Sequence, residues 1–191
     1  MPVSFVNLPI FTMLLSEVAS ACGAPFLQSF RVPLENLTRQ SSKDGDAPSK
    51  TAAATTSNSS KREQQFVGVI VTSGLARAIC NDANAGIKLE WDNWLRPQLQ
   101  ELLLQAPNEI YREWCQGLRH AVAVSAERQP NLAVQKELLQ LLAELECAAN
   151  TSGESSALTR ALIFTGAVLC ELTGLSHAEL KVALLRRLLK Y

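Results

Sequence analysis

The chain has 191 residues, a hydrophobic content of 47%, and 18 basic against 18 acidic side chains, so its formal net charge is zero. The length suffices for one domain with a sizeable core. Balanced charge disfavours a generally basic nucleic-acid binder, whose affinity comes from neutralising phosphates, and the hydrophobic content excludes a chain disordered throughout. Leucine is abundant and aromatic residues make up only 6%, which favours helix-on-helix packing.

Residues 1–38 predict a helical arm. Asn7 is a candidate N-cap and Pro9 suits a first helical turn. A stripe of apolar residues at helical spacing follows, which Gly23 can end; it consists of Ile10, Met13, Leu14 and Val18. A second short helix is then interrupted at Pro33. The arm is too small to fold alone, so we expect it to pack on the following domain or on a partner.

Residues 39–63 contain no large apolar side chain and are rich in Ser and Thr. Such a segment cannot bury enough surface to offset the entropy of ordering it. The sequence therefore predicts a flexible linker, a long disordered insertion between the arm and a helical core domain at 64–191. Its hydroxyl side chains near Lys61 and Arg62 are candidate phosphate acceptors, although a solvated insertion is the preferred interpretation.

Residues 66–80 fit two interpretations. The β-branched residues between Phe66 and Val71 are typical of a buried strand. A strand needs a neighbour, and no other segment has a strand pattern, so we predict a buried helix here. A strand would support an enzyme hypothesis with a phosphate-binding turn at Ser73 and Gly74, but the segment lacks the glycine-rich loop and the lysine that such a turn needs.

From Leu89 onward the sequence predicts a run of helices joined by short turns. Pro97 kinks the first of these or marks its true start, and Ser176 with Glu179 forms a capping box before the last. Short turns favour antiparallel neighbours. The predicted fold class is therefore all-α, an antiparallel helical bundle or short αα-stack of about 6–8 helices. The helices in this region are expected near 90–105, 107–127, 132–148, 155–173 and 177–190, with a turn at 150–153.

The sequence contains no catalytic or metal-binding constellation. The two histidines, His120 and His177, have no Cys, Asp or Glu at metal-ligand spacing, and no HExxH, GxSxG, Walker A or GxGxxG string is present. Cys115 and His120 lie five residues apart on one predicted helix and point in different directions, which disfavours a Cys–His nucleophile. We expect no enzyme activity, no cofactor and no small-molecule substrate.

Three LxxLL strings occur, at 99–103, 138–142 and 185–189. Leucines at i, i+3 and i+4 make an apolar ridge that fits a groove on another protein. In a leucine-rich helical chain the same spacing is ordinary core patterning. We assign the first two strings to the core and keep the third, in the terminal helix, as a candidate.

Tryptophan and arginine are enriched at interface hot spots. Trp91 and Trp94 lie about one helical turn apart, but tryptophan is also a good core residue. Core is the default for both, and exposure of Trp91 would favour an interface. The candidate partner-binding residues are Trp91, Trp94, Leu185, Arg186, Arg187, Leu188 and Leu189.

The last predicted helix is basic, with Lys181, Arg186, Arg187 and Lys190. Basic residues in a last turn suit the helix dipole; a partner helix face, an anionic membrane surface or a phosphate contact are the alternatives. The leading hypothesis is a non-enzymatic helical scaffold or adaptor subunit of an intracellular multi-protein complex, binding partners through apolar helix faces. The alternative is a helical nucleic-acid-associated protein that uses this basic helix.

The five cysteines favour a reducing compartment, nuclear or cytoplasmic. No two of them are closer than 23 residues, which gives no compact disulfide framework. No basic residue precedes Arg31, so we expect a buried helix at the N-terminus rather than a secretory signal. No uncharged apolar stretch reaches the length of a membrane span.

Overall fold

A computed structural model describes residues 7–43, 54–81, 85–123, 131–153, 155–172 and 178–189. These residues are helical almost throughout and include no strand, which confirms the all-α prediction. The α-helices are α1 (Leu8–Cys22), α2 (Ala24–Ser29), α3 (Arg31–Lys43), α4 (Ala54–Cys80), α5 (Ala85–Glu90), α6 (Arg96–Leu104), α7 (Tyr111–Val122), α8 (Leu132–Ser152), α9 (Ser155–Glu171) and α10 (Ala178–Leu188).

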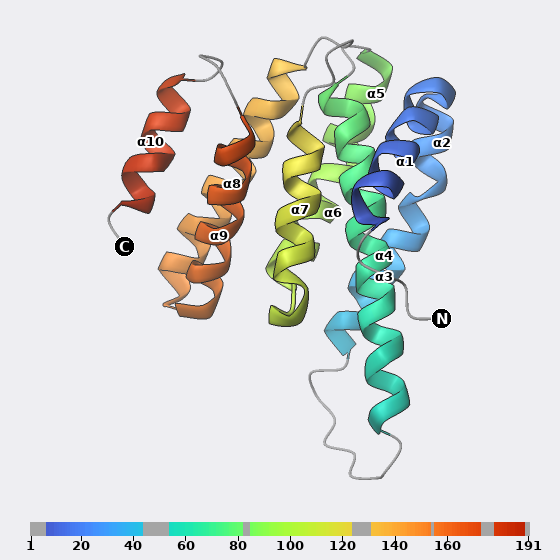
Figure 1. The fold of residues 1–191 in the computed structure, drawn as a ribbon, viewed down its shortest axis with the longest axis horizontal. Helices are drawn as coiled ribbons and strands as arrows, with labels where there is room; N and C mark the ends of the chain where they lie inside the picture. The colour runs from blue at the N-terminus through green and yellow to red at the C-terminus, as the bar shows by residue number, and fades with distance from the viewer. Residues whose placement is uncertain are drawn as a thin grey trace.

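Successive helical segments run in opposite directions and stack along the long axis of the molecule (Figure 1). Helix α4 packs against α7, and α7 packs against α9. Helix α2 contacts α5 and helix α6 contacts α8, while α1 packs on both α4 and α7. In Figure 1, α1 and α2 form the right end of the stack and α10, which packs on α9, forms the left end.

The arm is helical as predicted, but its local details differ. Helix α1 ends at Gly23, whose φ is 70°, while Asn7 makes no side-chain cap. The break after α2 falls at Phe30 rather than at Pro33. Pro33 instead occupies the first turn of α3, where its missing N–H leaves no helical hydrogen bond unmade.

Helices extend into the predicted linker from both sides. Helix α3 continues to Lys43 and α4 begins at Ala54, so parts of the range 39–63 are helical. Residues 44–53 lie outside the described part of the chain. The division into an arm, a linker and a core domain stays a prediction.

Residues 66–80 lie within α4, which confirms the helix prediction. Ser73 and Gly74 are buried inside this helix and form no turn. The strand that the enzyme hypothesis required is therefore absent from this described segment. The same stretch crosses α7 closely: a Cβ added to Gly117 would lie 3.1 Å from both the Cβ of Ser73 and the Cγ1 of Val69.

A π-helical turn (Trp91–Leu95) joins α5 to α6, and the N–H of Arg96 donates to the carbonyl oxygen of Trp91. Helix α6 begins at Arg96, so Pro97 marks the start of an α-helix, one of its two predicted roles. From Glu90 to Leu103, buried residues occur as adjacent pairs that repeat every four residues, whereas one α-helical turn contains only 3.6 residues. The π-helical turn contains more residues than an α-helical turn, so it keeps the successive pairs on the same buried side. The pairs are 90/91, 94/95, 98/99 and 102/103.

Two of the later helices differ in length from their predictions. Helix α7 ends at Val122, short of 127, because Ala123 is already extended with φ −62° and ψ 120°. Helix α8 continues to Ser152, so the turn predicted at 150–153 shrinks to Gly153, a left-handed C-cap with φ 72°. Ser176 of the predicted capping box lies outside the described residues, as does His177.

Candidate protein-binding faces

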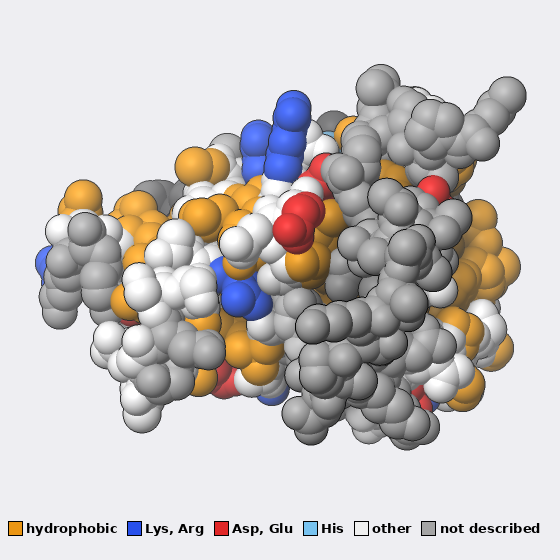
Figure 2. Space-filling view, turned by 90° about the horizontal axis from the view of Figure 1, so that it is seen from below, with side chains coloured by type: hydrophobic (Ala, Val, Ile, Leu, Met, Phe, Trp, Pro, Cys, Tyr) orange, Lys and Arg blue, Asp and Glu red, His pale blue; other side chains and the backbone are white. Residues whose placement is uncertain are grey.

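Helix α1 turns its large apolar side chains away from the protein. The exposed fraction is 52% at both Ile10 and Leu14 and 43% at Val18. The predicted stripe is therefore real as a helical pattern, but it faces outward and not into the core. We define the α1 face as Ile10, Phe11, Met13, Leu14 and Val18. Figure 2 shows hydrophobic side chains gathered at the right-hand edge, the end that α1 and α2 form in Figure 1.

Most of the buried residues of α1 are small, and α1 and α4 approach closely. A Cβ added to Gly74 would lie 2.9 Å from the Cβ and Cδ2 of Leu15. Small polar side chains, Thr12 and Ser16, are buried beside that contact, together with Ala19. Apolar residues all round are typical of a helix that is buried on every side. A contiguous exposed apolar patch typically marks an interaction site.

Helix α10 presents a second apolar strip at the opposite end of the stack. Leu185 is 47% exposed and Leu189 is 86% exposed, whereas Leu184 is buried against the rest of the protein. Arg186 is exposed beside them, and Leu188 is half-buried. We define the α10 face as Val182, Leu185, Arg186 and Leu189. The predicted residue Arg187 lies outside the described side chains.

The two LxxLL strings assigned to the core are buried. Their leucines, 99, 102, 103, 138, 141 and 142, are at most 9% exposed. Only the third string, on α10, presents leucines to solvent. Burial thus separates three strings that are identical as sequence patterns.

Trp91 and Trp94 do not fit a partner-binding role. Trp91 is fully buried and its indole N–H donates to Glu137 Oε2 at 2.8 Å. Trp94 is buried and donates to Glu90 Oε2 at 2.8 Å, while Gln28 donates to the other oxygen of Glu90 at 2.9 Å. The exposure that would favour an interface at Trp91 is not found, because both indoles pack in the core with their N–H groups satisfied.

The nucleic-acid alternative, which uses the basic residues of α10, stays a prediction. Lys181 donates from Nζ to the carbonyl oxygen of Leu172 at 3.1 Å, so this ammonium group binds a carbonyl oxygen at the C-terminal end of α9. Arg186 is exposed, while the side chains of Arg187 and Lys190 lie outside the described set. A phosphate-binding surface needs several accessible cations.

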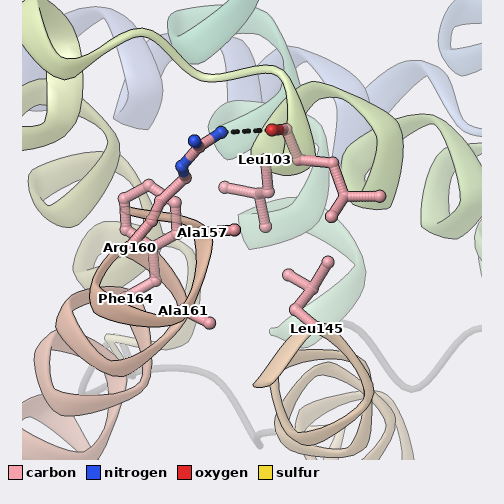
Figure 3. Close-up of a pocket in the computed structure, with 7 residues that line it drawn as sticks. Leu103, Leu145, Ala157, Arg160, Ala161 and Phe164 are labelled. Atoms are coloured by element: carbon pink, nitrogen blue, oxygen red, sulfur yellow. Dashed lines mark hydrogen bonds between the residues drawn. The ribbon is translucent and has the colours of Figure 1, made fainter. Parts of the chain in front are cut away.

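Two hollows lie in the surface of the described helices. One hollow has about 220 Å³ and lies between α6, α8 and α9 (Figure 3). The other, of about 310 Å³, adjoins α3, α4, α6 and the start of α7. The first is lined by Leu103, Leu104, Leu145, Ala157, Arg160, Ala161 and Phe164.

Arg160, at the rim of the first hollow, has a structural role. Its Nη1 donates to the carbonyl oxygen of Leu104, the last residue of α6 (Figure 3). Its guanidinium carbon lies 5.6 Å from the centre of the Tyr111 ring, within reach of a cation–π contact. A cation at a helix C-terminus also complements the helix dipole. Arg160 thus joins α9 to the end of α6 and to α7.

The described side chains offer no evident reactive centre. Burial raises the pKa of the Cys115 thiol, opposite to the direction that activates a cysteine nucleophile. No group of three or more His, Cys, Asp and Glu side chains within the described ranges is placed to bind a metal ion. None of the described helices combines the length and hydropathy that a bilayer crossing requires.

Comparison with known proteins gives one informative similarity. The chain is 24% identical over 185 residues to a protein of Arabidopsis thaliana named "Proteasome activator subunit 4". The match covers 95% of this chain but only 9% of the relative's length. No family model and no solved structure matches the chain. The similarity is compatible with a helical subunit of a protein complex.

Proposed function

We propose that the chain is a non-enzymatic helical scaffold or adaptor that binds a partner protein within an intracellular multi-protein complex. The observation that carries this proposal is the α1 face, on which five large apolar side chains are each at least 43% exposed. Removing such side chains from water on binding is favourable by roughly 25 cal/mol per Å² of apolar area. The stacked helices supply a stiff support for that face.

The relative's name suggests the class of partner. Because that protein is named as a subunit of a proteasome activator, we propose a proteasome as the partner of this chain. The relative is far longer, so the proposal concerns only the contribution of this segment and not the activity of the whole relative.

Binding of the purified chain to purified proteasomes, measured by biolayer interferometry, tests the proposal. We expect Leu14→Lys to weaken binding at least tenfold, because an ammonium group would be desolvated against an apolar surface. Leu132→Lys on α8 is the matched control, since Leu132 is 45% exposed and belongs to neither face. Absence of binding by the native chain would reject the proteasome as partner. Equal binding by the native and Leu14→Lys chains would reject the α1 face as the contact.

A further inference from the structure

The outward sides of α1 and α10 share one spacing, with the charged residue at i+7 on α1 and at i+4 on α10. Each carries three apolar residues and one charged residue at positions i, i+3, i+4 and i+7, which lie on the same side of a helix. On α1 these residues are Ile10, Met13, Leu14 and Glu17. On α10 they are Val182, Leu185, Arg186 and Leu189. Both sets span seven residue steps, about 10 Å along the helix axis.

The charged members of the two sets have opposite signs. Glu17 is the only charged residue of α1 and its side chain is exposed. Arg186 is exposed on α10. Each set therefore offers the other an apolar contact and one opposite charge, which fixes register and suppresses pairing of like with like.

The two sets lie at opposite ends of the stack (Figure 1), so they cannot meet within one molecule. We propose that a second copy of this chain docks its α10 face against the outward side of α1, head to tail. The proposal deepens the proposed function, because it names a second copy as one partner for these apolar faces. Glu17 of the first copy would then pair with Arg186 of the second.

Such a contact is heterologous and leaves one unpaired face at each end of the pair. Further copies can add in the same way, so the assembly grows as an open chain unless the rotation between copies closes a ring. Because the contact involves only two short helices, α1 of 15 and α10 of 11 residues, we expect it to bury less than the roughly 1,000 Å² of a stable interface. Association is therefore weak and depends on concentration.

Sedimentation velocity of the full chain over a wide concentration range is the first test. We expect the weight-average mass to rise with concentration above the 20.8 kDa of one copy. Leu14→Lys blocks the α1 end and Leu185→Lys blocks the α10 end, so each variant alone should stay at 20.8 kDa. Circular dichroism confirms that both variants are folded, and Leu132→Lys should associate like the native chain.

Mixing the two blocked variants gives the decisive result. A Leu14→Lys copy keeps its α10 face and a Leu185→Lys copy keeps its α1 face, so the mixture should form a 1:1 pair and nothing larger. Glu17→Arg alone and Arg186→Glu alone should each associate more weakly than the native chain. Their equal mixture should regain association, because every contact then joins opposite charges.

Three outcomes overturn the head-to-tail proposal: a native chain that stays monomeric, a Leu185→Lys variant that still pairs with itself, or blocked variants that do not combine. A monomeric chain that binds proteasomes through Leu14 would reject self-association and leave the proposed function standing. A chain that associates head to tail but does not bind proteasomes would reject the proteasome as partner and leave the self-association proposal standing.

Discussion

Replacing Gly117 with alanine tests how closely α4 and α7 approach. Alanine is favoured over glycine within a helix by about 1 kcal/mol. At Gly117, however, the added methyl would lie 3.1 Å from both Ser73 Cβ and Val69 Cγ1, and it would also meet the Ser73 hydroxyl. The Ser73 Oγ has no hydrogen-bond partner and can rotate away, but the other two atoms belong to packed positions on α4.

The net effect follows from two opposing magnitudes. Overpacking a close helix crossing costs about 1–3 kcal/mol, against the gain of about 1 kcal/mol in helix propensity. We therefore expect Gly117→Ala to lower the free energy of unfolding by up to about 2 kcal/mol. Gly166→Ala on α9 is the matched control, since nothing lies within 4 Å of a Cβ there. It should raise the free energy of unfolding by about 0.5–1 kcal/mol.

Urea unfolding followed by circular dichroism measures both variants, and an unchanged m-value shows that only stability has changed. Adding Ser73→Ala to Gly117→Ala should recover part of the loss, because one of the three close atoms is removed. If Gly117→Ala proved as stable as Gly166→Ala, α4 and α7 would lie further apart than described and the reasoning would fail.

Three other residues give separate predictions. Burial, together with the nearby Arg77, lowers the pKa of His120 below 6.5, so the unfolded chain binds a proton first and stability should fall as pH drops from about 6.5 toward the lowered pKa. His120→Asn should reduce this dependence of the urea midpoint on pH. Arg160→Met removes the charge-assisted bond to Leu104 and should lower the unfolding free energy by about 1–2 kcal/mol in urea titration. Burial raises the pKa of Cys80 to about 12, so mass spectrometry after iodoacetamide treatment at pH 8 should find Cys80 unmodified in native protein; modification there before unfolding would contradict its burial.

The α1 helix shows what sequence periodicity can and cannot determine. Pro9 and Gly23 correctly predicted where the helix begins and ends, and the apolar stripe correctly predicted its character. The direction of that stripe was not predictable, because it depends on the close approach of Leu15 to Gly74, two residues that are far apart in the chain. The inner side of α1 buries Thr12 and Ser16 together with Leu8 and Ala19.

The candidate partner-binding residues were likewise only partly predictable from the sequence. Leu185 and Leu189 are exposed, as their place in a terminal helix suggested. The burial of Trp91 and Trp94 could not be predicted without knowing that Glu137 and Glu90 lie beside their indole N–H groups. Their indole N–H groups find carboxylate acceptors, one of them on a helix remote in sequence. Residue type alone does not distinguish a buried, satisfied tryptophan from an interface residue.

The π-helical turn at Trp91–Leu95 constrains how the protein can change over evolution. A strict α-helix with buried pairs every four residues would rotate its buried side by about 40° per repeat. Loss of one residue, even exposed Asn93, would let this turn revert to an α-helix and rotate Trp91 away from Glu137. Because the buried pairs depend on this turn, we expect the number of residues in the run from Ala85 to Leu104 to be fixed. Relatives of this chain should therefore vary in residue type there far more readily than in residue number.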